Sequence, residues 1–274
     1  MGASVNLLKN GKIELIALDL DGTLLMGNGR IHPQNIQPIH TALSRGISVV
    51  LATGKTRQSA LEIIETLGLT TPGVFSQGMT IYDADGVVQR VVTLETAVIT
   101  AVVEFVEARN LPLIAYASDG LWATADDPYR QLLHTKYHEP LPTICHDFKQ
   151  KLNTMQITKL LLSDEINNDA TRADLERFLG NREYVVQAVP EYIEVMPLGV
   201  SKGEGVSWLL DRMGVDPANI MAVGDGENDL EMLRLAGLGV AMGNAGDCVK
   251  AAADVVVGSN EDAGVAEAIQ RFVL

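Results

Sequence analysis

The chain has 274 residues, a formal net charge of −14 and an apolar fraction of 47%. That length is sufficient for a full hydrophobic core and for two domains, and a composition with few aromatic residues is typical of an α/β protein. The negative charge argues against nucleic acid and anionic membranes as main partners, although a local cation and lysines can still bind an anionic substrate.

Cysteine usage and apolar runs indicate a protein of the reducing cytosol. Cys145 and Cys248 lie far apart and match no metal or redox spacing. No run approaches the roughly 20 apolar residues that span a bilayer, and residues 1–6 lack an export signal. We therefore expect a cytoplasmic protein.

The first predicted element is a buried strand that leads into two acidic residues. Residues 13–18 form a nearly unbroken apolar run, which is typical of a strand buried on both faces of a parallel sheet. Asp19 and Asp21 follow, and because side chains at positions i and i+2 of a strand point to the same side, the two crowd one site unless the chain bends away at once. Two carboxylates that crowd one site either raise a pKa or bind a cation. Because ligands bind at the carboxyl ends of parallel strands, we predict a site here.

Strands and helices alternate as far as residue 78. The pattern predicts a helix over 32–45, a strand over 47–52 that ends in Thr53-Gly54, a helix over 57–67 and a third strand over 74–76. Gly46 and Gly68 end the two helices. This βαβαβ alternation predicts an α/β fold with a Rossmann-like, doubly wound parallel sheet.

The middle of the chain has a different pattern, in which hairpin signals occur between helices. Turns are predicted at 85–86 and 118–120, helices over 95–109, 128–138 and 169–179, and strands over 158–162, 184–189 and 192–196. Such a mixture is typical of an α+β unit. We therefore predict an inserted second domain over residues 88–195, between core segments 1–87 and 196–274.

The first pattern returns after Gly199. Ser201 to Glu204 form a capping box that opens a helix running to residue 213. A strand over 220–223, a helix ending at 236, short strands over 239–242 and 255–257, and a closing helix over 263–272 follow.

Polar residues follow three strand ends of the predicted sheet: Asp19 with Asp21, Thr53 with Gly54, and Asp225 with Asn228 and Asp229. Lys202 lies in the first turn of a helix, where a cation is electrostatically unfavourable unless it holds an anion. Carboxylates from two strands form the oxygen-rich site that Mg²⁺ prefers. The set suits phosphoryl transfer, because it contains a carboxylate nucleophile, a second carboxyl as acid and base, a metal, a hydroxyl donor and a lysine.

These residues resemble, in order, the four motifs of the haloacid dehalogenase superfamily of phosphatases. Asp19-Leu20-Asp21-Gly22-Thr23 is similar to the first motif, and Thr53, Lys202 and residues 224–229 match the second, third and fourth. The resemblance covers essentially the whole chain, and the insert resembles the large α+β cap of the Cof-type sugar-phosphatase branch. It implies a Mg²⁺-dependent phosphomonoesterase that hydrolyses a small phosphorylated metabolite through an aspartyl-phosphate.

The resemblance also implies roles for the residues that react with substrate or hold it. Asp19 would be the nucleophile, and Asp21 would protonate the leaving alkoxide and then activate water. Thr53, with Gly54 beside it, and Lys202 would hold the phosphoryl oxygens.

A second group would bind the metal or contact the substrate. Asp19, Asp225 and the backbone carbonyl of Asp21 would ligate Mg²⁺, and Asp229 would support the metal and Lys202. Asn228 would contact the phosphate or the cap side of the substrate. In the insert, Tyr116, Asp119, Trp122 and the face from His134 to His138 are the candidates for contact with the leaving group.

Two positions depart from the branch pattern. The branch often has Arg after Thr-Gly, where this chain has Lys55 and then Arg57, and it often has Asn-Gly-Ala where this chain has Gln77-Gly78-Met79. Both lie beside the phosphate or the leaving group, so the branch's substrates transfer less well than its core chemistry.

Competing motifs predict other functions. Residues 199–203 match a G-x-S-x-G nucleophile elbow, but the triad histidine should follow the serine, and all five histidines precede Ser201. His134 and His138 share a helical face without a third zinc ligand at a convincing spacing. Residues 237–243 are similar to a dinucleotide loop in reversed order, with a strand after the first glycine instead of before it.

Two functional alternatives remain beside the hydrolase. A phosphotransferase or mutase would pass the aspartyl-phosphate to a sugar hydroxyl, and a non-catalytic phosphate-binding regulator would hold phosphate with the same residues. The acid/base residue Asp21 and the insert argue against the regulator.

Overall fold

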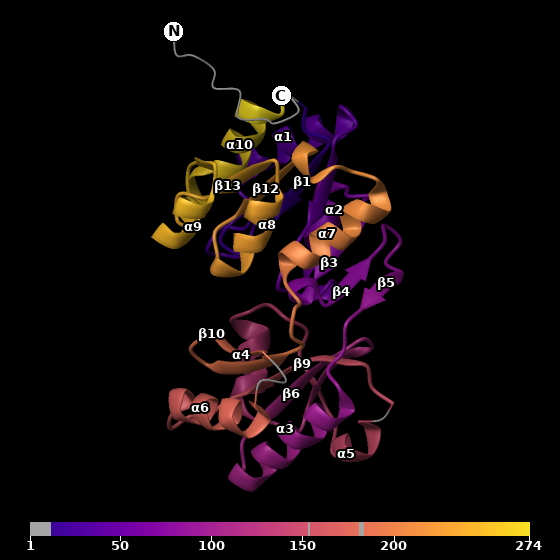
Figure 1. Ribbon diagram of the computed structural model, residues 1–274, viewed down its shortest axis with the longest axis vertical. Coiled ribbons are helices and arrows are strands. Elements are labelled where there is room, and N and C mark those ends of the chain that lie inside the picture. The colour runs from indigo at the N-terminus through magenta and orange to yellow at the C-terminus, as the bar shows by residue number, and fades with distance from the viewer. Residues whose placement is uncertain (1–11, 153, 181–183) are drawn as a thin grey trace. The chain divides into compact units, whose positions relative to one another are not determined.

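The computed structural model describes residues 12–152, 154–180 and 184–274, so the N-terminal residues for which no export signal is predicted lie outside the described part (Figure 1). The chain divides into two compact units. The core unit comprises the chain up to Arg90 and from Ser201 to Leu274, and the inserted unit comprises Val91–Val200. Of the described helices, none combines the length and apolarity needed to cross a bilayer.

A parallel five-stranded sheet forms the centre of the core unit in the described residues. Its strands are β1 (Leu15–Leu18), β2 (Ser48–Leu51), β12 (Ile220–Gly224), β13 (Leu238–Ala241) and β14 (Val255–Val256), in the order β14-β13-β12-β1-β2. β1 pairs in parallel with both β2 and β12, and Leu18 lies opposite Leu51 on one side and Val223 on the other. The residues that follow these three strands therefore meet at one edge of the sheet.

Helices cover both faces of this sheet, which confirms the doubly wound α/β fold. Ile16 and Leu18 pack with α1 (Pro33–Ser44), α2 (Leu61–Leu67) and α10 (Gly264–Phe272). Leu15 and Ala17 pack with α7 (Lys202–Met213), α8 (Leu230–Leu235) and α9 (Asp247–Ala252). Each fully buried leucine or isoleucine contributes roughly 1.5–3 kcal/mol relative to an exposed one, which explains the unbroken apolar run.

The third predicted strand does not extend the parallel sheet. β3 (Gly73–Phe75), β4 (Thr80–Tyr82) and β5 (Val88–Val91) form a separate three-stranded sheet, and β3 pairs antiparallel with β4. A single parallel bridge, between Ala52 and Val74, joins β3 to the segment after β2. The chain reverses after Phe75 because Ser76 and Gln77 adopt positive φ angles of 50° and 61°, so it returns as a hairpin.

The inserted unit is an α+β structure, as its hairpin signals predict. Its six-stranded sheet has the order β10-β11-β9-β6-β7-β8, formed by β6 (Leu113–Ala117), β7 (Gly120–Ala123), β8 (Thr143–Ile144), β9 (Ile157–Leu162), β10 (Tyr184–Val189) and β11 (Tyr192–Met196). Helices α3 (Thr96–Arg109), α5 (Phe148–Lys151) and α6 (Asn168–Leu179) pack on one face, and α4 (Pro128–Thr135) packs on the other.

The short elements of both units differ most from the sequence predictions. The pattern did not indicate β8, α5 or α9, which have only 2, 4 and 6 residues. Helix α4 ends at Thr135 instead of residue 138, because His138 adopts a positive φ of 56° and Pro140 follows. A 3₁₀ turn over Gln58–Ala60 precedes α2, which therefore begins later than predicted.

Candidate active site

Three strand ends bring acidic and hydroxyl groups to one edge of the core sheet. Asp19 follows β1 and is 4% exposed, and Thr53 follows β2 and is 1% exposed. Asp225 follows β12. In the described part of the chain, one group of acidic side chains could hold a metal: Asp19, Asp225 and Asp229, whose ligand atoms all lie within 4.8 Å of one another.

Lys202 enters this cluster from the first turn of α7. Its Nζ donates to Asp19 Oδ1 at 2.6 Å and to Asp229 Oδ1 at 2.8 Å, and the side chain is 2% exposed. Burial lowers the pKa of Lys202, but the two carboxylates outweigh it and raise that pKa above its ordinary value. The lysine that is unfavourable at a helix N-terminus is therefore compensated by buried anions.

Ser201 is an N-cap residue and not a nucleophile. Its Oγ accepts a hydrogen bond from Glu204 N at 3.0 Å and donates to the Glu231 carboxylate. The Glu204 carboxylate forms an ion pair with Arg90 at 2.7 Å. Of the two hydrogen bonds of a capping box, the one accepted by the serine side chain is therefore the one that forms here. The cap sets the first turn of α7 and with it the position of Lys202.

Asp229 is fully buried, and both of its carboxylate oxygens bind groups of the chain. Oδ1 accepts from Lys202, while Oδ2 accepts from the backbone N–H of Asp225 at 3.0 Å and of Gly226 at 2.9 Å. Asp229 therefore holds the loop after β12 and orients Lys202. Through these contacts Asp229 fixes the positions of two other residues of the cluster, Lys202 and Asp225.

The Asp225 carboxylate is held at both oxygens. Thr23 Oγ1 donates to Oδ1 at 2.8 Å, and Asn244 Nδ2 donates to Oδ2 at 3.3 Å and to the Gly22 carbonyl at 2.8 Å. Gly22 has a φ of 78°, and a Cβ there would lie 2.3 Å from Asp225 Oδ2, so the first motif requires glycine. Asn244 was not among the predicted residues, although it follows the end of β13 as the other polar residues follow their strands.

Asp21 does not share the buried cluster, contrary to the crowding expected from the i, i+2 spacing. The strand ends at Leu18 and the chain turns at Leu20, whose carbonyl accepts from Thr23 N and Leu25 N. The Asp21 side chain is 60% exposed, and its Oδ2 lies 3.2 Å from Lys55 Nζ. The carboxyl group that lies beside Asp19 in the cluster is therefore that of Asp229 and not that of Asp21.

Burial and neighbouring charge make Asp19 the most perturbed carboxyl of the site. Burial raises its pKa, Asp229 raises it further and Lys202 opposes both, with the result that the pKa of Asp19 is about 8. Burial likewise raises the pKa of Asp225. With all three carboxyls ionised, the single ammonium would leave two excess negative charges, so this form of the cluster matches a hard divalent cation in both charge and donor atoms.

Thr53 and Asn228 are connected through Gln77. Thr53 Oγ1 accepts from Lys55 N at 3.1 Å, so its hydroxyl can donate to a phosphoryl oxygen. Gln77 N donates to the Thr53 carbonyl at 3.0 Å, and Gln77 Oε1 accepts from Asn228 Nδ2 at 3.1 Å. A Cβ at Gly54 would lie 2.7 Å from the Gln77 side-chain amide, so a larger residue there would displace that amide.

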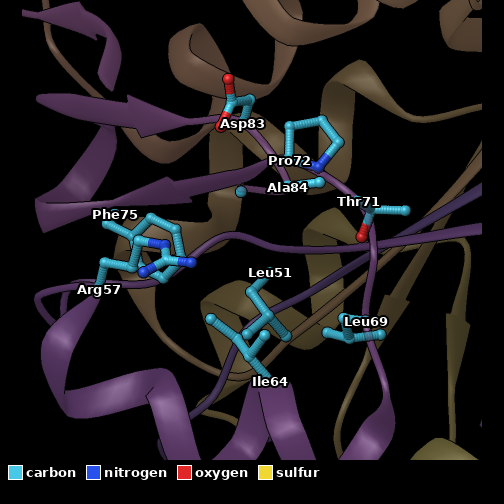
Figure 2. Close-up of a pocket in the computed structure, with 10 residues that line it drawn as sticks. Leu51, Arg57, Ile64, Leu69, Thr71, Pro72, Phe75, Asp83 and Ala84 are labelled. Carbon is cyan, nitrogen blue, oxygen red and sulfur yellow. The ribbon is translucent and has the colours of Figure 1, made fainter. Parts of the chain in front are cut away.

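A hollow in the core unit that none of the cluster residues lines is too small for a substrate. Figure 2 shows its mostly apolar lining, which includes Leu51, Ile64 and Leu69, and its volume is about 10 Å³, no more than one water molecule needs. Arg57 also lines it and lies over the Tyr82 ring at 5.6 Å. Arg57 therefore belongs to this hollow, and Lys55 is the cation paired with Asp21.

The aromatic candidates of the inserted unit lie on opposite faces of its sheet. Tyr116 is buried in the cluster that contains Leu133 and Tyr192, whereas Trp122 packs against the cluster of α3. Trp122 Nε1 donates to Asp119 at 3.0 Å, and His134 Nδ1 lies 2.7 Å from the Glu139 carbonyl. The predicted residues therefore do not form one contact surface.

Asp19, Asp225 and Lys202 thus lie together, as the resemblance to haloacid dehalogenase phosphatases implies. The chain belongs to that family, because the family model for haloacid dehalogenase-like hydrolases matches residues 16–269. It is an enzyme, a phosphatase of the Cof-type branch, so the family identified from the four motifs is confirmed.

Individual relatives align with nearly the whole chain. The chain is 31% identical to the 5-amino-6-(5-phospho-D-ribitylamino)uracil phosphatase YcsE of Bacillus subtilis, over 96% of each protein. It is 39% identical, over 95% of its length, to a chloroplastic Arabidopsis thaliana protein named endoribonuclease YBEY, but it spans only 47% of that longer protein. A crystal structure from Thermotoga maritima matches with a TM-score of 0.89 and 30% identity, covering 96% of this chain and 98% of the other.

Proposed function

We propose that this phosphatase is a Mg²⁺-dependent phosphomonoesterase that acts through an aspartyl-phosphate formed on Asp19. The observation that carries this proposal is the buried pair of Asp19 and Lys202, 2.6 Å apart, in a cluster with two further carboxyl groups, Asp225 and Asp229. A buried carboxylate fixed by a lysine at the end of a buried parallel strand suits nucleophilic attack on phosphorus.

The metal site would be formed by Asp19, Asp225 and the backbone carbonyl of Asp21. The donors are oxygens, and the charge of the cluster favours a divalent cation, so the residues fit Mg²⁺. When bound, Mg²⁺ would supply positive charge to the phosphoryl oxygens and to the acidic cluster. Asp229 would keep the loop and Lys202 in place, because its two oxygens bind only groups of the chain in the contacts described above.

Asp19 would attack while Lys202 holds its other oxygen. One carboxylate oxygen accepts from Lys202, which orients the second toward an incoming phosphorus atom. The new O–P bond forms on Asp19 as the bond to the leaving oxygen breaks. The Thr53 hydroxyl and the Lys202 ammonium would hold phosphoryl oxygens and thereby stabilise the charge of the transition state.

Asp21 would act as acid and then as base. Its exposed carboxyl lies two residues from Asp19, so it can give a proton to the leaving oxygen and later take one from the attacking water. Asn228, linked to Gln77 at the same strand edge, would contact the phosphate or the leaving group.

We further propose that the inserted unit sets substrate choice and that the core unit supplies the chemistry. All of the residues assigned above lie in the core unit. The small phosphorylated metabolite would then be selected by side chains that differ from those of relatives acting on other substrates.

The test is hydrolysis of a panel of phosphorylated metabolites and of p-nitrophenyl phosphate, with Mg²⁺ and with chelator, by wild type and by Asp19→Asn. We expect Mg²⁺-dependent phosphate release by wild type and none by the variant, because a neutral amide is a poor nucleophile. More than a few per cent of residual activity would point to direct attack by water. Product analysis with added sugar acceptors distinguishes a hydrolase from a phosphotransferase.

A further inference from the structure

Lys55 is a buried lysine with an exposed partner. Its side chain is 9% exposed, and its Nζ lies 3.2 Å from Oδ2 of Asp21, whose side chain is 60% exposed. Burying an ammonium group costs several kcal/mol unless it is paired, whereas lysines in ordinary surface pairs remain hydrated. The fold therefore places this charge where it meets the carboxylate of Asp21.

The backbone of Lys55 is fixed on both sides. Its N–H donates to Thr53 Oγ1 at 3.1 Å, and its carbonyl accepts from Ser76 N at 2.9 Å. Ser76 and Gln77 both adopt positive φ, a conformation that non-glycine residues keep only where the surrounding structure requires it. The Lys55 side chain thus starts from the same rigid loop that positions Thr53.

We propose that Lys55 is a positioning residue that holds the Asp21 carboxylate in its role as base. This inference rests on the function proposed above. The buried ammonium meets Oδ2 of Asp21 at 3.2 Å and so holds the carboxylate in one direction, which is what a group that accepts a proton from water requires. Lys55 therefore acts in the second half of the reaction, the hydrolysis of the aspartyl-phosphate on Asp19.

In that step the oxygen of a water molecule attacks phosphorus, and one water proton moves to Asp21. A new O–P bond forms, and the bond between phosphorus and the Asp19 oxygen breaks with its electron pair returning to the Asp19 carboxylate. Inorganic phosphate leaves, and Lys55 keeps all of its protons. A fixed Asp21 carboxylate accepts the proton along one direction, and misplacement of an acid or base group by about 1 Å can cost on the order of a hundredfold in rate.

The experiment separates the two halves of the reaction in the full chain with Mg²⁺. With p-nitrophenyl phosphate the leaving anion needs no proton, so stopped-flow absorbance reports the first half directly. We expect Lys55→Met to keep the fast release of one equivalent of nitrophenolate and to lower the steady-state rate about 10- to 100-fold. Acid-quenched protein should then carry more phosphate than wild type.

Three variants serve as controls. Lys55→Arg retains a cation that can pair with Asp21 and should restore most of the steady-state rate. Lys149→Met removes a lysine that pairs with Glu107 in the inserted unit, and it should behave as wild type. Asp21→Asn should show the same burst followed by slow turnover, and adding Lys55→Met to it should cause no further loss.

Each outcome decides the inference. It is overturned if Lys55→Met keeps the wild-type steady-state rate, or if burst and steady state fall equally, since Lys55 would then act on binding or on the first half. If Lys55→Met does not fold, Lys55→Gln, which removes the charge but keeps a polar side chain, takes its place in the comparison with Asp21→Asn, and an additive double variant then excludes coupling between the two residues. A wild type that hydrolyses no phosphate ester would instead refute the proposed function.

Discussion

The perturbed carboxyl of Asp19 predicts how the stability of the metal-free protein varies with pH. Because burial and Asp229 raise the pKa of Asp19 from 3.8 to about 8, the folded chain binds a proton there that the unfolded chain has released. A group whose pKa is raised on folding contributes stability at low pH, and that contribution is lost as pH rises toward the folded value. Between pH 4 and pH 8, Asp19 therefore makes the wild type less stable with increasing pH.

Asp19→Asn removes this titration while keeping the shape of the side chain. Each pH unit within the window changes the free energy of unfolding by at most about 1.4 kcal/mol for one proton. Between pH 5 and pH 7 in EDTA, the variant should therefore gain up to about 3 kcal/mol of stability relative to wild type. Although it lacks the nucleophile, it should be the more stable protein at pH 7.

Urea unfolding of the full chain at several pH values, in EDTA and in saturating Mg²⁺, measures this difference in stability between wild type and Asp19→Asn. Mg²⁺ should stabilise the wild type more at pH 7 than at pH 5, because binding releases the proton from Asp19. Asp211→Asn, on the exposed side of α7, controls for the general effect of removing a carboxylate. If wild type and Asp19→Asn change in parallel over this range in EDTA, Asp19 is already ionised without metal and Lys202 alone compensates its burial.

The remaining predictions concern the metal site and the insert. Asp225→Ala should cancel the stabilisation by Mg²⁺, about 2.7 kcal/mol for wild type at 100 times the dissociation constant, and an undiminished calorimetric shift would contradict the assignment. Asn244→Ala should weaken Mg²⁺ binding about 10- to 100-fold in a calorimetric titration, because Asp225 loses a hydrogen-bond donor that also binds the Gly22 carbonyl. An unchanged affinity would mean that the hydrogen bond from Thr23 is enough to orient Asp225. Replacing residues 91–200 with a Gly-Ser linker should preserve some hydrolysis of p-nitrophenyl phosphate and abolish discrimination among larger esters, whereas a folded variant without Mg²⁺-dependent hydrolysis would show that the insert supplies part of the chemistry.

The sequence predicts the parallel sheet and the positions where its polar residues emerge, because both depend on local patterns. A buried parallel strand needs an apolar residue at every position, so β1 and β12 can be recognised without knowing their partners. The glycines and the N-cap Ser201 likewise act through neighbouring backbone, and α7 begins and ends where they predict.

Contacts between distant parts of the chain could not be predicted in this way. Thr23 donates to a carboxylate 202 positions away, and Lys202 binds one 183 positions before it. The Asp21 side chain lies outside the cluster because the chain turns at Leu20. The alternation of side-chain directions in a strand does not predict where such a turn begins. The pairing of Lys55 with Asp21 and the position of Asn244 arise only when β2, β13 and the loop after β1 meet in space.

The strand order also has a consequence for synthesis on the ribosome. β1 lies inside the sheet between β2 and β12, but β12 begins at Ile220, after the whole insert. At translation rates of roughly 5–20 residues per second, the open edge of β1 waits on the order of ten seconds for that neighbour. The insert can complete its own sheet in that interval, whereas the nascent first segment can pair β1 only with β2 and leaves the other edge of this wholly apolar strand open. Newly made N-terminal fragments should therefore aggregate or bind chaperones until the last fifth of the chain, which begins with β12, emerges.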